Sequence, residues 1–222
     1  MKLIISLNRK ERLYDYVSMG IDCFILGGQY SFYAPSYFSL DDISQMVKQY
    51  PQCSFYVAVN ALYDEHEIEA VEAYIEALSK MAIHGILFQD FGVLQIVKNK
   101  GYHFDMMYTP ETLNTNAMTL NVLKQQGVTS AQLARVIPLE EQLSIHQQVH
   151  MPLMLQVHGV EYIAASKRAL LTNYQEASGL AFDHKSQTRL TIQPRNSDYV
   201  FHIYENERGT HIFSKTRLYM LD

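Results

Sequence analysis

The chain has very few cysteines, with only Cys23 and Cys53 among its 222 residues. Both lie in short apolar runs, which favours two reduced core thiols over a disulfide or a metal site. The apolar runs are strand-sized, so the sequence offers no candidate for a membrane-spanning helix. The first residues pass from a short apolar run to a charged segment, unlike a secretory signal. We therefore expect a cytoplasmic protein that does not act at a membrane.

An excess of positive charge is also missing. The chain has 18 Lys and Arg against 23 Asp and Glu, which gives a formal net charge of −5 at pH 7. This balance argues against a strongly basic nucleic-acid-binding surface and leaves room only for a local patch.

Recognisable catalytic motifs are absent as well. The sequence has no Gly-x-Ser-x-Gly, no His-Glu-x-x-His and no cysteine–histidine pairing. No nucleophile with an adjacent base is identified, so the catalytic residues stay unassigned.

What the sequence does contain is an alternation of short apolar segments and helix-like segments. Strands are expected at residues 3–7, 23–28, 54–60, 85–90, 104–108, 131–137 and 153–157. Helices are expected at residues 9–19, 65–81, 93–98, 116–126 and 139–148, with a further one opened by Ser39 as N-cap. A helix-like run also follows Gly159 and extends to residue 174, with residues 166–168 inside it. Nearly continuous apolar strands are typical of parallel strands buried on both faces.

The repeat of roughly 20–30 residues is that of the units of a (β/α) barrel, whose full size is about 250 residues. An open doubly wound sheet is the alternative. That fold usually has a glycine-rich phosphate loop after its first strand, where this chain has Asn8, Arg9 and Lys10.

The pattern changes after residue 174. Apolar and polar residues alternate at 188–193, 199–204 and 210–214, with turn signals at 194–197 and 207–209. The predicted fold is therefore α/β: an incomplete TIM-type barrel of about seven parallel strands, with a C-terminal antiparallel hairpin segment. We assign residues 1–175 to the barrel and 176–222 to a hairpin extension of the same domain. The barrel should be incomplete or irregular between its first and seventh strands.

Several polar residues follow predicted strands, where a barrel places its ligand site. Gln89 is expected in a pocket, whereas the adjacent Asp90 is favoured as a helix cap. Glu111 and Asn116 lie in the loop after the fifth strand, and each is a candidate ligand-binding residue. The alternatives are a solvated carboxylate and a simple N-cap, respectively.

Two further candidates carry a titratable or cationic group. Arg135 is expected to project from a strand, either pairing with a carboxylate or binding an anionic ligand. His158 follows the seventh strand and could bind a ligand or carry a proton. The loop with Tyr30, Tyr33 and Tyr37 is the best candidate for contact with a ligand or partner, although an ordinary barrel rim is the simpler interpretation.

The sequence also carries a set of ordered motifs. They are GIDCFILGG at 20–28, GILFQDFG at 85–92, LARVIPLEE at 133–141, VHG at 157–159 followed by SKR at 166–168 and LLTNY at 170–174, and GTHIFS at 209–214. As a set they resemble the U32 peptidase family, also called the collagenase-like protease family. YTPETLNTN at 108–116 resembles a short branch of that family, similar to the smaller member of a paired system for tRNA hydroxylation.

The resemblance implies a (β/α) barrel and, in many members, an iron–sulfur cluster held by four cysteines. The family's cysteine positions fall here at Tyr162, at Ala169, near Thr188 and near Tyr219. None of these residues supplies a thiolate, so we expect no iron–sulfur cluster and no other cofactor. Arg168 matches the family's signature arginine and is the last candidate ligand-binding residue.

The signature departs from the family in two further places. Its acidic residue falls near Met154, and its glycine falls at Lys167. The family's later "L-K-I-E-G-R" strand has no match either, so we expect a fragment or a member that lacks the last βα unit.

The functional expectation follows from the resemblance. It implies an accessory, non-catalytic subunit in hydroxylation of the tRNA wobble uridine, working with a larger cluster-bearing U32 paralogue and reaching tRNA through that complex. One alternative is a collagenase-like peptidase acting alone. Another is a ligand-binding barrel without catalysis. The peptidase name of the family does not by itself establish proteolysis or any other enzyme activity.

Overall fold

The structure is a computed structural model that describes residues 2–111, 114–183 and 190–220. The chain divides into two compact units, Met1–Met154 and Leu155–Asp222. Within the described ranges, none of the helices has the length and apolar character needed to cross a membrane.

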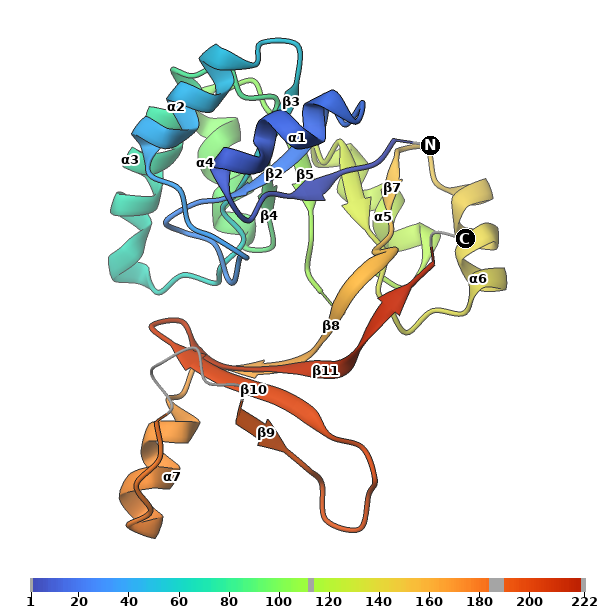
Figure 1. The fold of residues 1–222 in the computed structure, drawn as a ribbon. Helices are drawn as coiled ribbons and strands as arrows, with labels where there is room; N and C mark the ends of the chain where they lie inside the picture. The colour runs from blue at the N-terminus through green and yellow to red at the C-terminus, as the bar shows by residue number, and fades with distance from the viewer. Residues whose placement is uncertain (1, 112–113, 184–189, 221–222) are drawn as a thin grey trace. The chain divides into compact units, whose positions relative to one another are not determined.

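The first unit is built on a seven-stranded parallel sheet whose strands follow one another in chain order (Figure 1). The strands are β1 (Ile5–Ser6), β2 (Cys23–Gly27), β3 (Ser54–Ala58), β4 (Gly85–Phe88), β5 (Asp105–Tyr108), β6 (Ser130–Gln132) and β7 (Leu153–Met154). In the described part of the chain, β1 pairs only with β2, and β7 pairs only with β6. The sheet is thus an incomplete TIM-type barrel, as predicted, and it is open between its first and seventh strands.

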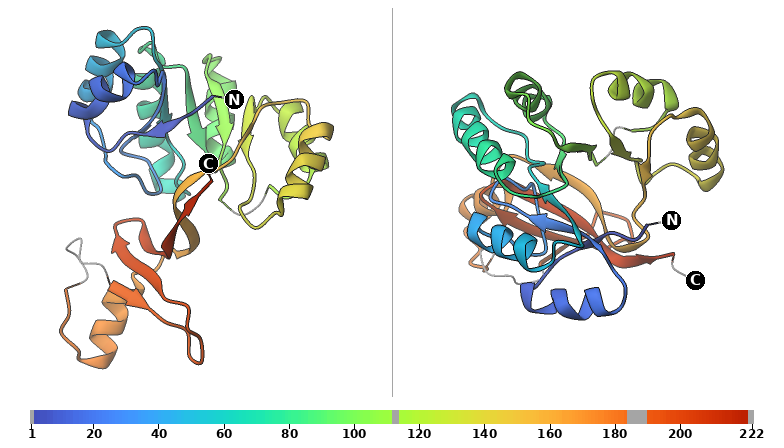
Figure 2. Two further views of the ribbon diagram at one scale, coloured as in Figure 1. Left: turned by 45° about the vertical axis from the view of Figure 1, so that its right-hand side comes forward. Right: turned by 90° about the horizontal axis from the view of Figure 1, so that it is seen from above.

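Helical segments connect successive strands and lie on the outer side of the curled sheet (Figure 2). They are η1 (Lys10–Arg12), α1 (Leu13–Ser18), α2 (Leu40–Gln49), η2 (Glu65–Glu67), α3 (Ile68–Ser79), α4 (Phe91–Lys100), α5 (Ala117–Gln125) and α6 (Leu139–Gln148). The predicted bounds of α6 are those observed, and the other predicted helices overlap observed ones.

The main core lies between the sheet and these helices. Alternate strand residues such as Phe24, Phe55 and Phe88 are fully buried there against helix residues such as Ile43 and Ile75. Burial of each such side chain contributes about 1.5–3 kcal/mol. The other face of the sheet holds a much smaller buried cluster, Ala58, Leu87 and Met107, with Ile4, Ile25, Tyr56 and Met154 partly buried around it. The helix-facing side therefore supplies most of the packing energy.

Side-chain caps fix where two of the helices begin. Ser39 Oγ accepts a hydrogen bond from Asp42 N at 3.1 Å, and the Asp42 carboxylate accepts one from Ser39 N at 3.4 Å. This capping box satisfies backbone donors that the first turn leaves unpaired. Asp90 caps α4 by accepting a hydrogen bond from Gly92 N at 2.8 Å. Both caps confirm the sequence prediction.

The second unit contains a four-stranded antiparallel sheet in the order β8-β11-β10-β9. Its elements are β8 (His158–Ser166), α7 (Leu170–Ser178), β9 (Leu190–Ile192), β10 (Phe201–Asn206) and β11 (Gly209–Tyr219). The predicted C-terminal hairpins are thus present. The unit begins at Leu155, so the hairpin extension predicted to start at residue 176 lies wholly within it.

One prediction about this region was wrong. The run after Gly159 was predicted to be helical up to residue 174, whereas β8 extends to Ser166 and the helix begins only at Leu170. Val160, Tyr162 and Ile163 favour a strand. The pairing partner that decides the matter is β11, about fifty residues further along the chain, so the local pattern alone misses it.

Candidate functional site

Three side chains from three different loops meet in the first unit. Tyr33 follows β2, Glu111 follows β5 and Arg135 follows β6. Arg135 Nη2 lies 3.0 Å from Glu111 Oε2, and the two side chains are only 12% and 8% exposed. The Tyr33 hydroxyl donates to Glu111 Oε1 and accepts from Arg135 Nη2, both at 3.5 Å. The cluster lies beyond the carboxyl ends of the strands, where barrel enzymes and binding proteins place their sites.

Burial sets the electrostatics of this cluster. Desolvation raises the pKa of Glu111 above its usual range, although Arg135 and the Tyr33 hydroxyl act in the opposite direction. A buried ion pair is costly to desolvate, so it is weak evidence of a purely stabilising role. Shifted carboxyl groups of this kind gather at functional sites.

Glu111 also has an unusual backbone conformation. Its φ is 64°, in the left-handed region that side-chain-bearing residues rarely adopt. Such a conformation costs of the order of 1–3 kcal/mol and is retained where the surroundings require it. The strain and the buried ion pair fall on the same residue, which makes Glu111 the centre of the candidate site.

A second polar group connects the ends of β2, β3 and β4. Gln89 Nε2 donates to Asn60 O at 2.6 Å, and Asn60 Oδ1 accepts from Phe32 N at 3.1 Å. Ser31, which is buried, accepts from Gly28 N and donates to Ala58 O. These bonds hold the loops after β2 and β3 together, and the loop after β2 also carries Tyr33.

Asn114 is the most unusual polar residue on this side of the sheet. Its side chain is buried, and Nδ2 donates to Gln132 O at 2.8 Å. Its main-chain oxygen accepts from Ala134 N at 3.0 Å. Within the described residues, Asn114 Oδ1 has no hydrogen-bond donor. Buried acceptors are normally satisfied, so this atom marks a place where a ligand or water donor could bind.

The six candidate residues separate into two groups. Glu111 and Arg135 form the ion pair, in the loops after β5 and β6. Gln89 follows β4 at the same edge of the sheet. Asn116 is an exposed N-cap of α5, accepting a hydrogen bond from Thr119 N at 2.9 Å. This observation supports the simpler of its two interpretations.

The other two candidates, His158 and Arg168, lie in the second unit and are exposed. The His158 ring contacts the ring of Tyr219 edge-on, with centroids 5.7 Å apart. Arg168 lies in the turn between β8 and α7, where its main-chain oxygen accepts from Thr210 Oγ1.

Arg135 differs from its prediction in one respect. It was expected on a strand, but β6 ends at Gln132 and Arg135 lies in the following turn. The pairing partner β7 is only two residues long, so the ladder ends early. Asn60 and Asn114 were missed altogether. The available signal was that Asn60 is the polar last residue of a predicted apolar strand, 54–60, whereas the observed strand ends at Ala58.

The residues present do not fit an iron–sulfur cluster. Cys23 begins β2 and Cys53 immediately precedes β3, so both lie at the amino ends of the strands, away from Glu111. Burial raises the pKa of both thiols, which disfavours the thiolate that a cluster iron requires. Of the cluster positions expected from the resemblance, Tyr162 and Tyr219 lie in β8 and β11, Ala169 precedes α7, and Thr188 is outside the described residues.

The chain is similar in sequence to one protein family and to several known proteins. Residues 8–222 match the sequence model of peptidase family U32. The tRNA hydroxylation protein P2 of Bacillus subtilis is 25% identical over 227 residues, which cover 100% of this chain and 74% of that protein. The tRNA hydroxylation protein P1 of the same organism is 23% identical over 181 residues, covering 79% of this chain and 43% of that protein. A solved structure of the U32 peptidase Mk0906 covers 85% of this chain and 82% of its own, with a TM-score of 0.61 and 12% identity, and supports the fold.

Proposed function

The chain belongs to peptidase family U32, and from that premise we propose that it is an accessory subunit in tRNA hydroxylation. In this proposal it works beside a larger, cluster-bearing member of the family. It contributes a binding surface, and the partner supplies the iron–sulfur chemistry.

The observation that carries this proposal is the extent of the similarity to protein P2. That alignment takes in the whole of this chain, whereas the alignment to protein P1 takes in 79% of this chain and less than half of P1. Both relatives are named as tRNA hydroxylation proteins. The whole of this chain therefore aligns with about three quarters of P2, whereas only part of it aligns with less than half of P1.

The accessory role is supported by the chemistry of the side chains. Four thiolates are needed for the family's cluster, and this chain has two buried cysteines. In the described residues, no three His, Cys, Asp or Glu side chains gather as a metal site would require. The sequence also has none of the common nucleophile–base motifs.

A second candidate is a ligand-binding barrel without catalysis. It is favoured by one specific feature, the buried Glu111–Arg135 pair on a strained loop. The two functions are compatible, because an accessory subunit can bind a small ligand at the carboxyl ends of its strands.

The test is deletion of the gene in its native host, with hydroxylated uridine in total tRNA measured by mass spectrometry of the nucleosides. We expect hydroxylation to fall strongly and to return when the parent gene is restored. A tagged copy should also co-purify with a larger U32 relative that contains iron. Unchanged hydroxylation in the deletion strain would refute the proposal.

Expression of E111Q/R135M in the deletion strain distinguishes the two candidates. Restored hydroxylation would show that the ion-pair site is dispensable for the accessory role. Lost hydroxylation, with the larger relative still bound, would show that the site takes part in it.

A further inference from the structure

The second unit contains a short two-stranded extension of its sheet. β10 pairs with β11 only up to Ser214, opposite Phe201. Beyond that point, in the described residues, β11 pairs only with the beginning of β8, and the last matched positions are Arg217 with Val160 and Tyr219 with His158. The two strands run side by side beyond β10 (Figure 1). We refer to residues 158–160 and 215–219 as the β8–β11 ribbon.

A β-bulge fixes the start of this ribbon. Phe213 is opposite Tyr162 and Arg217 is opposite Val160, so β11 advances four residues while β8 advances two. Ser214 holds the bulge, because its Oγ accepts from Glu161 N at 2.8 Å and donates to Thr216 O at 2.7 Å. Bulges redirect the side chains that follow them.

The ribbon combines exposed cations with an exposed aromatic ring. Lys215, Arg217 and His158 are exposed, and Tyr219 is 58% exposed. Because paired residues share a face of a sheet, Arg217, Tyr219 and His158 lie on one side. The His158 and Tyr219 rings confirm this by their edge-on contact at 5.7 Å.

No carboxylate neutralises these cations within the part of the chain that the structure describes. The ion pairs found there are all formed by residues of the first unit, and none involves Lys215 or Arg217. Glu161 belongs to the opposite face, since it alternates with Val160 and Tyr162 along β8.

The two units also differ in their charge. Residues 155–222 have eight Lys and Arg against seven Asp and Glu, whereas residues 1–154 have ten against sixteen. An anionic polymer is therefore repelled less by the second unit than by the first. Exposed cations beside an exposed aromatic ring are the combination with which proteins hold single-stranded nucleic acids.

We propose that the β8–β11 ribbon is a contact surface for single-stranded RNA. Lys215 and Arg217 bind backbone phosphates, and a base stacks on Tyr219. This inference rests on the proposed function, because it names the part of the chain that would contact tRNA during hydroxylation.

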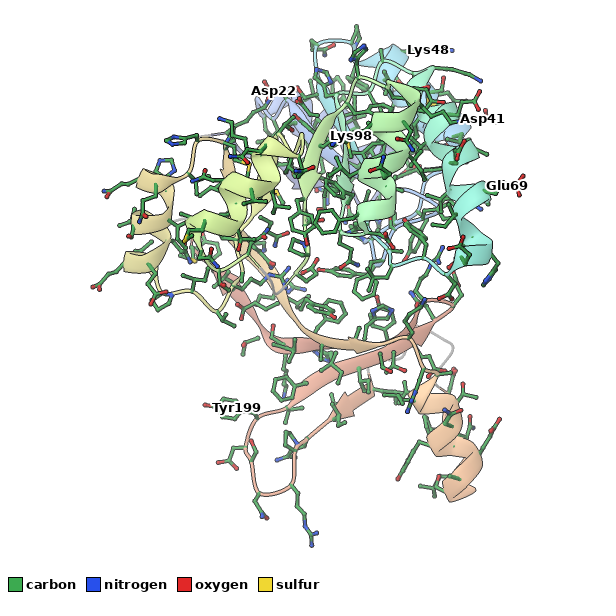
Figure 3. All side chains as sticks on the ribbon, turned by 180° about the vertical axis from the view of Figure 1, so that it is seen from behind. Asp22, Asp41, Lys48, Glu69, Lys98 and Tyr199 are labelled. Atoms are coloured by element: carbon green, nitrogen blue, oxygen red, sulfur yellow. The ribbon has the colours of Figure 1, made fainter. Side chains whose placement is uncertain are left out.

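The experiment measures affinity for an unmodified tRNA transcript and for unstructured oligouridine by fluorescence anisotropy, over a range of salt concentrations. The variants are K215A/R217A and Tyr219→Leu. The matched controls are K48A/K98A, which removes two exposed cations of the first unit, and Tyr199→Leu, which changes another exposed tyrosine of the second unit (Figure 3). Circular dichroism confirms that every variant is folded.

We expect K215A/R217A to weaken tRNA binding about tenfold and to reduce the slope of log affinity against log salt by about 1.4, for two single-strand phosphate contacts. Tyr219→Leu should weaken oligouridine binding at least about fivefold, with little change in the salt slope. The controls should stay within about twofold of the parent chain.

The inference fails if the two ribbon variants bind as tightly as the controls, or if the folded parent chain shows no RNA binding. It also fails if K215A/R217A loses the larger relative in a pull-down while RNA affinity is unchanged, because the ribbon would then be a protein interface. These outcomes are separate from the proposed function, which depends on hydroxylation in the deletion strain. Lost hydroxylation after deletion together with normal RNA binding by the ribbon variants would refute this inference alone.

Discussion

Glu111 Oε2 lies 3.0 Å from Arg135 Nη2, although the two residues are separated by α5 and β6 in the chain. The pair therefore joins the loops that follow two neighbouring strands. Its burial means that each charge depends on the other for compensation, and this dependence can be measured.

Replacing one partner of the pair should be strongly destabilising. Arg135→Met leaves the Glu111 carboxylate buried without its counter-charge, which typically costs about 3–5 kcal/mol. The double variant E111Q/R135M removes both charges and should recover most of that loss. Urea unfolding followed by tyrosine fluorescence measures both.

The matched control for this prediction is Lys80→Met, which breaks the exposed Lys80–Glu76 pair in the same unit. It should have little effect, because exposed pairs contribute little to stability. A double variant as unstable as Arg135→Met would show that shape or hydrogen bonding, rather than charge compensation, governs the site.

The pH dependence of stability should report on Glu111. Its pKa in the folded chain is raised above the ordinary glutamate value of 4.5, mainly by burial. A raised folded-state pKa means that the folded chain binds the proton more tightly than the unfolded chain does. The resulting stability is present below about pH 4.5 and is lost as pH rises through the folded-state pKa.

The measurement compares the parent chain with Glu111→Gln from about pH 4 to about pH 7. Glutamine does not titrate, so the parent should lose stability relative to this variant as pH rises. In Glu111→Gln, Arg135 lacks its carboxylate partner at every pH. This lowers the stability of the variant by a constant amount and does not change how the stability difference varies with pH. A relative stability that increases with pH would mean that Arg135 holds the Glu111 pKa below its usual value.

Asn116 should behave as a helix cap and not as a site residue. Asn116→Ala removes the hydrogen bond to Thr119 N and should cost about 1 kcal/mol. Asn116→Ser keeps a capping oxygen and should cost only a few tenths of that amount. Neither change should reduce tRNA hydroxylation in the complemented deletion strain, and a specific loss of hydroxylation in Asn116→Ser would restore its ligand-binding interpretation.

The features that the sequence predicted correctly are those that depend on residues close together in the chain. The helix Leu139–Gln148 and the Ser39 cap were predicted correctly, because propensity and capping depend on a few neighbouring residues. The order and parallel character of the seven strands followed from apolar segments that any barrel must bury on both faces.

The features that were missed depend on distant partners. Only the pairing with β11 makes residues 158–166 a strand, and the early end of β6 follows from the short β7. The positive φ of Glu111 is equally hard to foresee, since glutamate gives no sign of it and glycine is the usual residue there. Asn114 Oδ1 is recognisable only once its surroundings are known.

Gly209 provides the sharpest test of the second unit, because two separate effects forbid a side chain there. Its φ is 113°, and an added Cβ would lie 2.0 Å from Ser166 O and 2.9 Å from Lys167 Cα. Both contacts are with backbone, so the turn between β10 and β11 would have to move away from the end of β8. Gly209→Ala should therefore destabilise the sheet by several kcal/mol, at the upper end of the range for single substitutions.

Gly179 in the same unit is the matched control for the backbone effect alone. Its φ of 69° is also left-handed, but an added Cβ would meet no atom within 4 Å. Gly179→Ala should cost about 1–2 kcal/mol, the ordinary penalty of a left-handed alanine. Hydrogen exchange of the backbone amides of the second unit distinguishes the two substitutions. We expect faster exchange throughout the four-stranded sheet in Gly209→Ala, and only near the end of α7 in Gly179→Ala. Equal effects of the two substitutions would mean that the turn can shift freely, and that the close approach of Gly209 to Ser166 does not hold the sheet together.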